Sequence, residues 1–169
     1  MPETPQQYTE RMLNHSRGKD PLRLQQAAPR KFAALAKRLN KKQLARRPAP
    51  GKWSIGEILA HMADAELVIG YRLRLILAAN GTAIQAFDQD VWAETFGYSR
   101  RDPKISLEMF RALRENNLRL LSSVSRQLWK NYGEHSERGK ETVEHIVKMI
   151  AGHDLNHLQQ VEKIVKQSR

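Results

Sequence analysis

Apolar residues recur three or four positions apart in several long segments of this chain. The spacing predicts amphipathic helices over 21–39, 54–79, 106–124 and from about 142 onwards, with a shorter helix over 6–14. Sustained apolar–polar alternation, the signature of strands, is missing from the sequence. Long helices bury apolar stripes against one another, so the pattern predicts an all-α fold, a four-helix bundle with short additional N-terminal and connecting helices.

Local signals place several helix ends. Ser54 and Glu57 have the spacing of a capping box, which predicts that a helix begins there, and Asn80–Gly81 predicts where it ends. Pro29 should kink or divide the helix over 21–39, and the prolines of 46–52 predict a loop. We expect one bundle domain over 21–169, preceded by an N-terminal extension or short helix over 1–20.

The connections differ in character. Residues 82–101 are irregular and rich in aromatic side chains, with a short helix expected over 88–95, and residues 133–140 are polar and rich in turn formers. The connection over 82–101 is longer than two antiparallel helices need between them. In the segment 106–124 we expect Phe110 and four leucines (Leu107, Leu113, Leu118 and Leu121) to face inward and several arginines to face outward.

Charge and composition narrow the chemistry. The net charge is +11, and residues 17–52 hold twelve Lys or Arg against the single acid Asp20. Such a segment can bind nucleic acid or an acidic partner, although a solvated helix face is the interpretation we favour. The chain has no cysteine, so any metal must be bound through nitrogen and oxygen. Neither a signal sequence nor a membrane span is recognisable, which predicts a cytoplasmic protein.

Three histidines carry the candidate chemistry. His153 and His157 are four residues apart on one predicted helix, so their side chains are neighbours and can bind one metal ion. His61 lies beside the apolar stripe of an earlier predicted helix, so its ring should point inward or along a cleft. If His61 faces the pair, three ligands hold the ion and leave positions open, as in catalytic sites. The alternative is that these histidines lie at the core edge and bond to carbonyl groups or water.

Acidic residues lie near each histidine in the sequence. Glu57 and Asp64 are one helical turn on either side of His61, and Asp154 follows His153. A carboxylate can accept the second ring proton of a metal-bound histidine, or a proton from bound water. Glu57, Asp64 and Asp154 are therefore candidates for these roles, although Glu57 is also expected to cap its helix and the other two can simply be solvated.

Two stretches resemble the motifs of a known family. Residues 53–61 read Trp-Ser-Ile-Gly-Glu-Ile-Leu-Ala-His, and residues 153–160 read His-Asp-Leu-Asn-His-Leu-Gln-Gln. Together they are similar to the motifs of the DinB-like superfamily. The resemblance implies up-down-down-up connections and a divalent metal, commonly nickel or zinc, on His61, His153 and His157. It also implies thiol-dependent transferase or metal-dependent hydrolase activity, and frequently a homodimer.

Two functional interpretations follow. The first is a metal-dependent enzyme acting on a small-molecule substrate, either as a small-thiol-dependent S-transferase or as a metal-assisted hydrolase. Any sulfur would then arrive as a low-molecular-weight thiol co-substrate, because the chain has no cysteine. The second is a non-catalytic binding protein whose basic segment, residues 17–52, contacts nucleic acid or an acidic partner.

Overall fold

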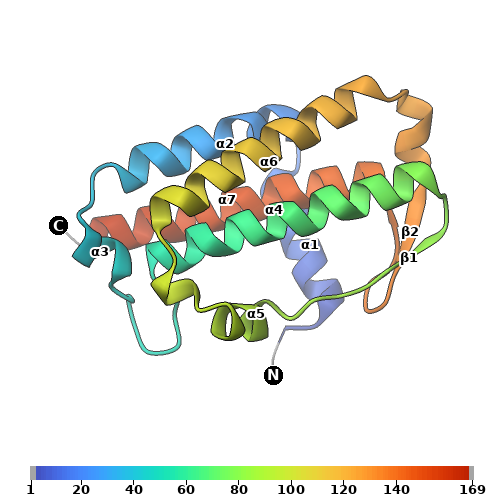
Figure 1. The fold of residues 1–169 in the computed structure, drawn as a ribbon. Helices are drawn as coiled ribbons and strands as arrows, with labels where there is room; N and C mark the ends of the chain where they lie inside the picture. Colours follow the sequence, from blue (N-terminus) through green and yellow to red (C-terminus); the bar gives the residue numbers. More distant parts are fainter. Residues whose placement is uncertain (1–2, 168–169) are drawn as a thin grey trace.

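Long helices lie side by side along most of the molecule in the computed structural model, which describes residues 3–167 (Figure 1). Within that range four helices form the bundle: α2 (Pro21–Ala36), α4 (Ile55–Ala78), α6 (Pro103–Ser123) and α7 (Val143–Gln167). Helices α4 and α6 run in one direction, and α2 and α7 run in the opposite direction. The connections are therefore up-down-down-up, as predicted.

Shorter elements surround this bundle. They are α1 (Pro5–Ser16), α3 (Lys41–Ala45), α5 (Gln89–Thr95), the 3₁₀ helices η1 (Tyr98–Arg100) and η2 (Arg126–Lys130), and the strands β1 (Thr82–Ile84), β2 (Tyr132–His135) and β3 (Gly139–Thr142). The connection between α4 and α6 carries β1, α5 and η1 back along the length of the bundle (Figure 1). Because α4 and α6 are parallel, the connection has to make this return.

The helix ends follow the local signals closely. Ser54 and Glu57 form the predicted capping box at the start of α4. Helix α6 begins at Pro103, earlier than predicted, because Asp102 caps it and proline suits its first turn. Pro29 is buried inside α2 and does not divide that helix. Proline removes one backbone donor, and burial of its ring in the core offsets part of that cost.

The small sheet was not predicted. Among the described residues, β1 pairs in parallel with β2, and β2 pairs antiparallel with β3. Strands of three or four residues are too short to show alternation, and the β1–β2 pairing joins segments about fifty positions apart. Residues 133–140, expected to be only turns, thus form most of a hairpin that leads directly into α7.

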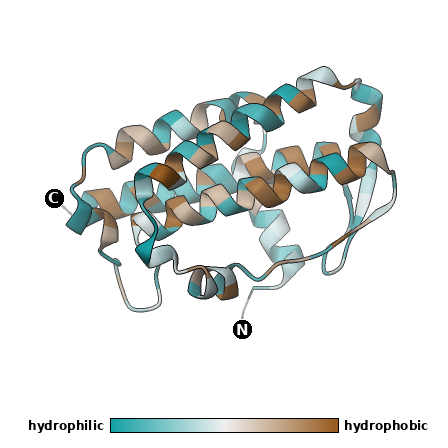
Figure 2. Cartoon of the chain, in the orientation of Figure 1, coloured by the Kyte–Doolittle hydropathy of each residue, from teal (hydrophilic) through white to brown (hydrophobic). Residues whose placement is uncertain are grey.

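A belt of buried polar side chains divides the hydrophobic core into two clusters. Toward the sheet, one cluster includes Leu73 and Ile146, and toward the other end a second includes Phe32 and Leu158. Brown hydrophobic segments recur along the long helices and are interrupted by teal polar ones (Figure 2). The polar belt contains Gln25, His61, Glu66, Arg114, Asn117, His153, Asp154 and His157.

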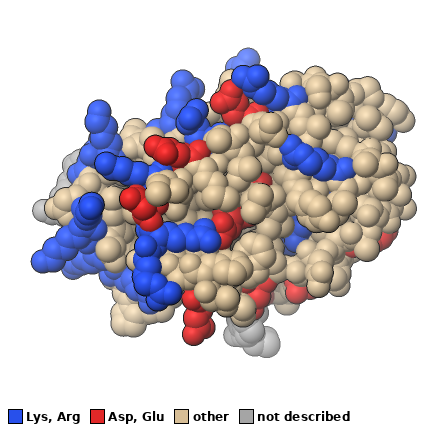
Figure 3. All heavy atoms as spheres, in the orientation of Figure 1, with Lys and Arg blue, Asp and Glu red and all other residues tan. Residues whose placement is uncertain are grey.

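The basic segment lies on the surface. All twelve Lys and Arg side chains of residues 17–52 are exposed, and blue side chains gather around α3 and the neighbouring helix ends (Figure 3). No described helix is long and apolar enough to cross a membrane. The exposure of this segment agrees with a solvated face, and it also leaves the segment accessible to an acidic partner.

Helix α1 packs against α7 immediately beside the histidines. Met12 is fully buried, and a Cβ atom added to Gly152 would lie 1.7 Å from the Met12 carbonyl oxygen. The Ser16 hydroxyl donates a hydrogen bond to the Lys148 carbonyl at 3.0 Å. Residues 5–16, where a short helix over 6–14 was predicted, therefore form one wall around the middle of α7.

Replacing Gly152 with alanine should separate these two helices. We expect Gly152→Ala to lower the free energy of unfolding by about 3 kcal/mol, because a backbone carbonyl cannot yield to the new methyl group. Gly56→Ala is the matched control, since its Cβ atom would lie 3.4 Å from its nearest neighbours, an ordinary contact. Urea unfolding of both variants measures the difference. Equal stability of the two variants would contradict the tight helix contact.

Candidate metal centre

The structure brings the three predicted histidines together. His61 comes from α4, and His153 and His157 come from α7. Their ring centroids are 4.5–5.2 Å apart, and one nitrogen from each ring lies within 4.8 Å of the others. All three side chains are buried. This arrangement is a group of three imidazoles able to hold one metal ion.

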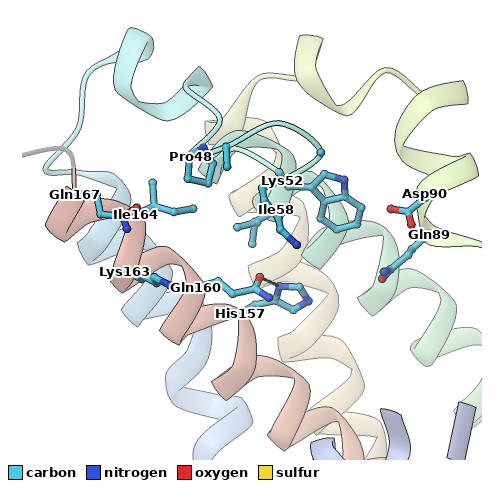
Figure 4. A pocket seen from close by; sticks show the side chains of 13 residues that line it. Pro48, Lys52, Ile58, Gln89, Asp90, His157, Gln160, Lys163, Ile164 and Gln167 are labelled. Atoms are coloured by element: carbon cyan, nitrogen blue, oxygen red, sulfur yellow. Dashed lines mark hydrogen bonds between the residues drawn. The ribbon is translucent and has the colours of Figure 1, made fainter. Parts of the chain in front are cut away.

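The ring nitrogens are only partly satisfied by protein groups. His61 Nε2 and His153 Nε2 face each other at 3.0 Å. His157 Nδ1 lies 2.9 Å from Gln160 Oε1, so in the tautomer that leaves Nε2 free its Nδ1–H donates to this amide oxygen (Figure 4). His61 Nδ1 is buried and has no hydrogen-bond partner among residues 3–167. Two facing lone pairs repel each other unless a proton or a cation lies between them.

Burial keeps these rings neutral. It lowers the pKa of His157 to about 4, although the hydrogen bond to Gln160 acts in the opposite direction. The pKa values of His61 and His153 lie well below 6.5, mainly because of burial and then because of His157. Neutral imidazole is the form that binds metal, so the rings need no deprotonation at pH 7.

The donor set fits a divalent ion. Three neutral nitrogens, supplied from two helices and lying near cavities, match the composition of catalytic sites that bind nickel or zinc through histidine. A shared ion would take the place of the proton that must otherwise lie between the Nε2 atoms of His61 and His153. The residues present therefore fit the predicted metal.

The three predicted carboxylates lie elsewhere. Glu57 binds Arg47 and caps α4, and these contacts lower its pKa against the effect of burial. Asp64 accepts hydrogen bonds from the Tyr98 hydroxyl at 2.9 Å and from Arg101 at 2.8 Å. Asp154 is bound by Arg114. Their hydrogen bonds and ion pairs within the described residues are to these partners rather than to the histidine rings.

Several arginines of the segment 106–124 were predicted to face outward, but Arg114 is one of the most buried side chains. Its guanidinium binds both oxygens of Asp154 and lies 2.7 Å from Glu66 Oε2. Burial opposes the charged form, but the two carboxylates outweigh it and raise the pKa of Arg114. The sequence signal that could have revealed this was a pair of acids, Glu66 and Asp154, on the apolar faces of two other helices.

Two further neighbours were also missed as site residues. The Trp53 ring lies with its centroid 5.0 Å from that of His61, and Gln160 orients His157. Trp53 had a clear signal as an apolar residue just before the helix start, but that signal indicates only helix capping. Gln160 lies three residues after His157, close enough on a helix for their side chains to meet.

Cavities reach the histidines from two sides. The His157 cavity, about 520 Å³, is lined by residues that include Lys52, Trp53, Asp90, His157 and Lys163 (Figure 4). The His61 cavity, about 320 Å³, is lined by residues that include Tyr8, His61, Arg72, Met149 and His153. Gln89 lines both cavities. A small molecule entering either cavity would meet the imidazole group.

Comparison with known proteins agrees with this geometry. The model of the DinB superfamily matches residues 24–161. A protein of Oceanobacillus iheyensis named "Putative metal-dependent hydrolase" is 27% identical over 128 residues, 76% of this chain and 74% of the relative. YfiT of Bacillus subtilis, with the same descriptive name, is 25% identical over 116 residues, 68% of this chain and 65% of the relative.

A solved structure supports the fold. The structure of YfiT, described as "a probable metal-dependent hydrolase with an unusual four-helix bundle topology", superimposes with a TM-score of 0.82. The alignment covers 88% of this chain and 85% of the other, at 21% sequence identity. At that identity the likeness establishes the four-helix bundle and leaves the chemistry to be argued from the site.

The buried histidines should make the metal-free protein sensitive to acid. Burial lowers the pKa of His157 from its ordinary value of 6.5 to about 4 in the folded protein, so the unfolded chain binds more protons between these values. The free energy of unfolding therefore falls as the pH falls through that window, by about 2 kcal/mol from His157 alone between about pH 7.5 and about pH 5.

Urea unfolding of chelator-treated protein at the two pH values measures this loss. In His157→Gln the loss should shrink by about 2 kcal/mol, because a glutamine side chain does not titrate. An unchanged loss in His157→Gln would show that this ring is not buried in its neutral form.

Proposed function

The chain belongs to the DinB superfamily, and we propose that it is a metal-dependent enzyme whose nickel or zinc ion is held by His61, His153 and His157. The observation that carries the proposal is the meeting of three buried, neutral imidazoles that line two cavities. Three protein ligands leave a position open for a nucleophile or a substrate atom. The names of the relatives support metal-dependent chemistry.

When bound, such an ion would lower the pKa of a bound water or thiol and polarise a substrate. The protein's own residues would hold and position these groups. The amide oxygen of Gln160 accepts a hydrogen bond from His157 Nδ1–H, which leaves His157 Nε2 free, and Trp53 packs against the ring of His61. The buried ion pairs of Arg114 fix α7 at Asp154, next to the ligand His153.

We propose hydrolysis as the first candidate reaction. Attack by water requires a group that takes its proton, and Asp90 lines the His157 cavity opposite α7 (Figure 4). The Asp90 carboxylate has no hydrogen-bond or ion-pair partner among residues 3–167. It is thus available as a proton acceptor, unlike Glu57, Asp64 and Asp154.

Thiol transfer is the second candidate, and a different observation favours it. No carboxylate of the described chain contacts the histidine rings, and a metal-bound thiol loses its proton without the help of a base. The two reactions are distinguished by whether turnover requires an added low-molecular-weight thiol. Binding of nucleic acid or an acidic partner by the basic segment, and a homodimer, stay predictions.

Removing the histidine pair should abolish metal uptake. We expect purified, untagged protein to contain about one nickel or zinc ion per chain, and His153→Ala/His157→Ala to contain almost none, because a single imidazole binds weakly. His145→Gln serves as the control, since it alters α7 outside the group. Elemental analysis gives the metal content, and circular dichroism shows whether the helices persist. Equal metal content in the folded double variant would refute the site.

A further inference from the structure

The His61 cavity is also lined by an arginine, Arg72, that the proposed chemistry does not use. On α4, residues 61, 65, 69 and 72 follow one another at intervals of four, four and three, so they lie on one helix face, and all four line this cavity. At 1.5 Å per residue, His61 and Arg72 are about 16 Å apart along the axis. The lining of the cavity thus includes imidazoles and, three helical turns further along α4, a guanidinium.

Arg72 is unusual among the buried charged groups. Its side chain is only 5% exposed, yet it forms no ion pair within the described residues. One nitrogen, Nη2, donates to the Gln85 carbonyl, and the guanidinium lies 5.7 Å from the ring centroid of Phe87. Its Nε and Nη1 groups have no hydrogen-bond partner among residues 3–167. Arginine at such depth is ordinarily paired with a carboxylate.

The charges around Arg72 leave it electrostatically unsatisfied. Neighbouring Arg138 is engaged by both oxygens of Glu141, so this carboxylate is already shared. Burial and then Arg138 lower the pKa of Arg72 to about 10, while Glu141 and Glu137 act in the opposite direction. Arg72 is therefore still cationic at neutral pH, and an anion in the cavity would supply the missing partner.

The other walls of the cavity combine apolar and charged side chains. The apolar ones include Ala65 and Ile69 from α4, Met149 and Ile150 from α7, and Tyr8 from α1, and the charged ones are Glu3, Glu137 and Arg138. Two of these charges are already paired, because Glu3 binds Arg11 and Arg138 binds Glu141. The matched region of the family model begins at residue 24, so α1 lies outside it. This wall is contributed by a part of the chain that the family model does not include.

We infer that the substrate of this site is an organic carboxylate with an apolar middle, whose carboxylate binds Arg72 while its reacting group lies at the histidines. The inference rests on the proposed metal-dependent function and adds the substrate class. A planar guanidinium with free N–H groups suits a carboxylate, which can accept two parallel hydrogen bonds. The His157 cavity is a weaker candidate for the anion, because its Lys52 and Lys163 are exposed on the surface.

Hydroxamates with different far ends test this inference on zinc-loaded protein. A hydroxamate binds the metal, and the eight-carbon suberic monohydroxamate carries a carboxylate where octanohydroxamate carries a methyl group. We expect the carboxylate probe to bind about tenfold more tightly, as measured by calorimetry, because it gains charge-assisted hydrogen bonds to Arg72. The same two probes are also made with six and with ten carbons. The preference for the carboxylate is then judged at the chain length whose carboxylate probe binds most tightly.

Variants then show which residue causes the preference for the carboxylate probe. Arg72→Met should abolish the preference for the carboxylate probe and leave octanohydroxamate binding unchanged, and Arg72→Lys should retain part of the preference. Lys163→Met, in the His157 cavity, should leave the preference intact. Thermal unfolding shows whether each variant is folded, and the wild-type comparison remains decisive if Arg72→Met is not.

The outcomes separate the two proposals. If neither hydroxamate binds the zinc-loaded protein, the metal-dependent function fails. If both bind equally at every length, the metal site stands and the assignment of Arg72 is overturned. A preference that disappears in Lys163→Met and persists in Arg72→Met would also overturn it, because the carboxylate would then occupy the other cavity.

Discussion

The structure depends on a polar belt buried across the middle of a hydrophobic core. Buried polar groups are costly unless they are paired, and here the requirement is met unevenly. On one side of the belt Arg114 joins α6 to Glu66 of α4 and Asp154 of α7, so that three helices share a network of ion pairs. On the other side the Nε2 atoms of His61 and His153 face each other at 3.0 Å, and His61 Nδ1 is buried with no hydrogen-bond partner among residues 3–167. That contrast is the main physical reason to place a cation there.

The two halves of the belt are connected through adjacent residues. Asp154, which Arg114 holds, directly follows His153, and Gly152 directly precedes it and allows α1 to approach closely. The position of α7, which carries His153 and His157, is therefore fixed by α6 on one side and by α1 on the other. Rigid placement of ligands by the scaffold is what a metal site needs to select its geometry.

Much of this could be predicted from the sequence, because the relevant signals are local. The capping box at Ser54, the long helices and the pairing of His153 with His157 all depend on residues a few positions apart. The joining of His61 to that pair, from a helix about ninety positions away, was only a possibility on the residues alone, and the resemblance to a family turned it into a prediction. The family motifs indicated that two segments distant in the sequence meet, which the spacing of apolar residues cannot indicate.

What could not be predicted depends on contacts between distant segments. Arg114 was expected to be exposed, because arginine usually is, and only its position between two acids from other helices reverses that expectation. The strands are too short to show a pattern, and Asp90 and Arg72 gain their roles solely from the cavities they line. Charge pairing and cavity shape are properties of the folded chain.

X-ray absorption at the metal edge of the loaded protein tests the central claim most directly, because it reports the ligands of the ion itself. The account predicts three imidazole nitrogens at about 2.0–2.1 Å together with at least one light atom from solvent. A spectrum with an oxygen-only shell, or with a single imidazole, would contradict it. Such a result would mean that the buried histidines are a structural feature of the core.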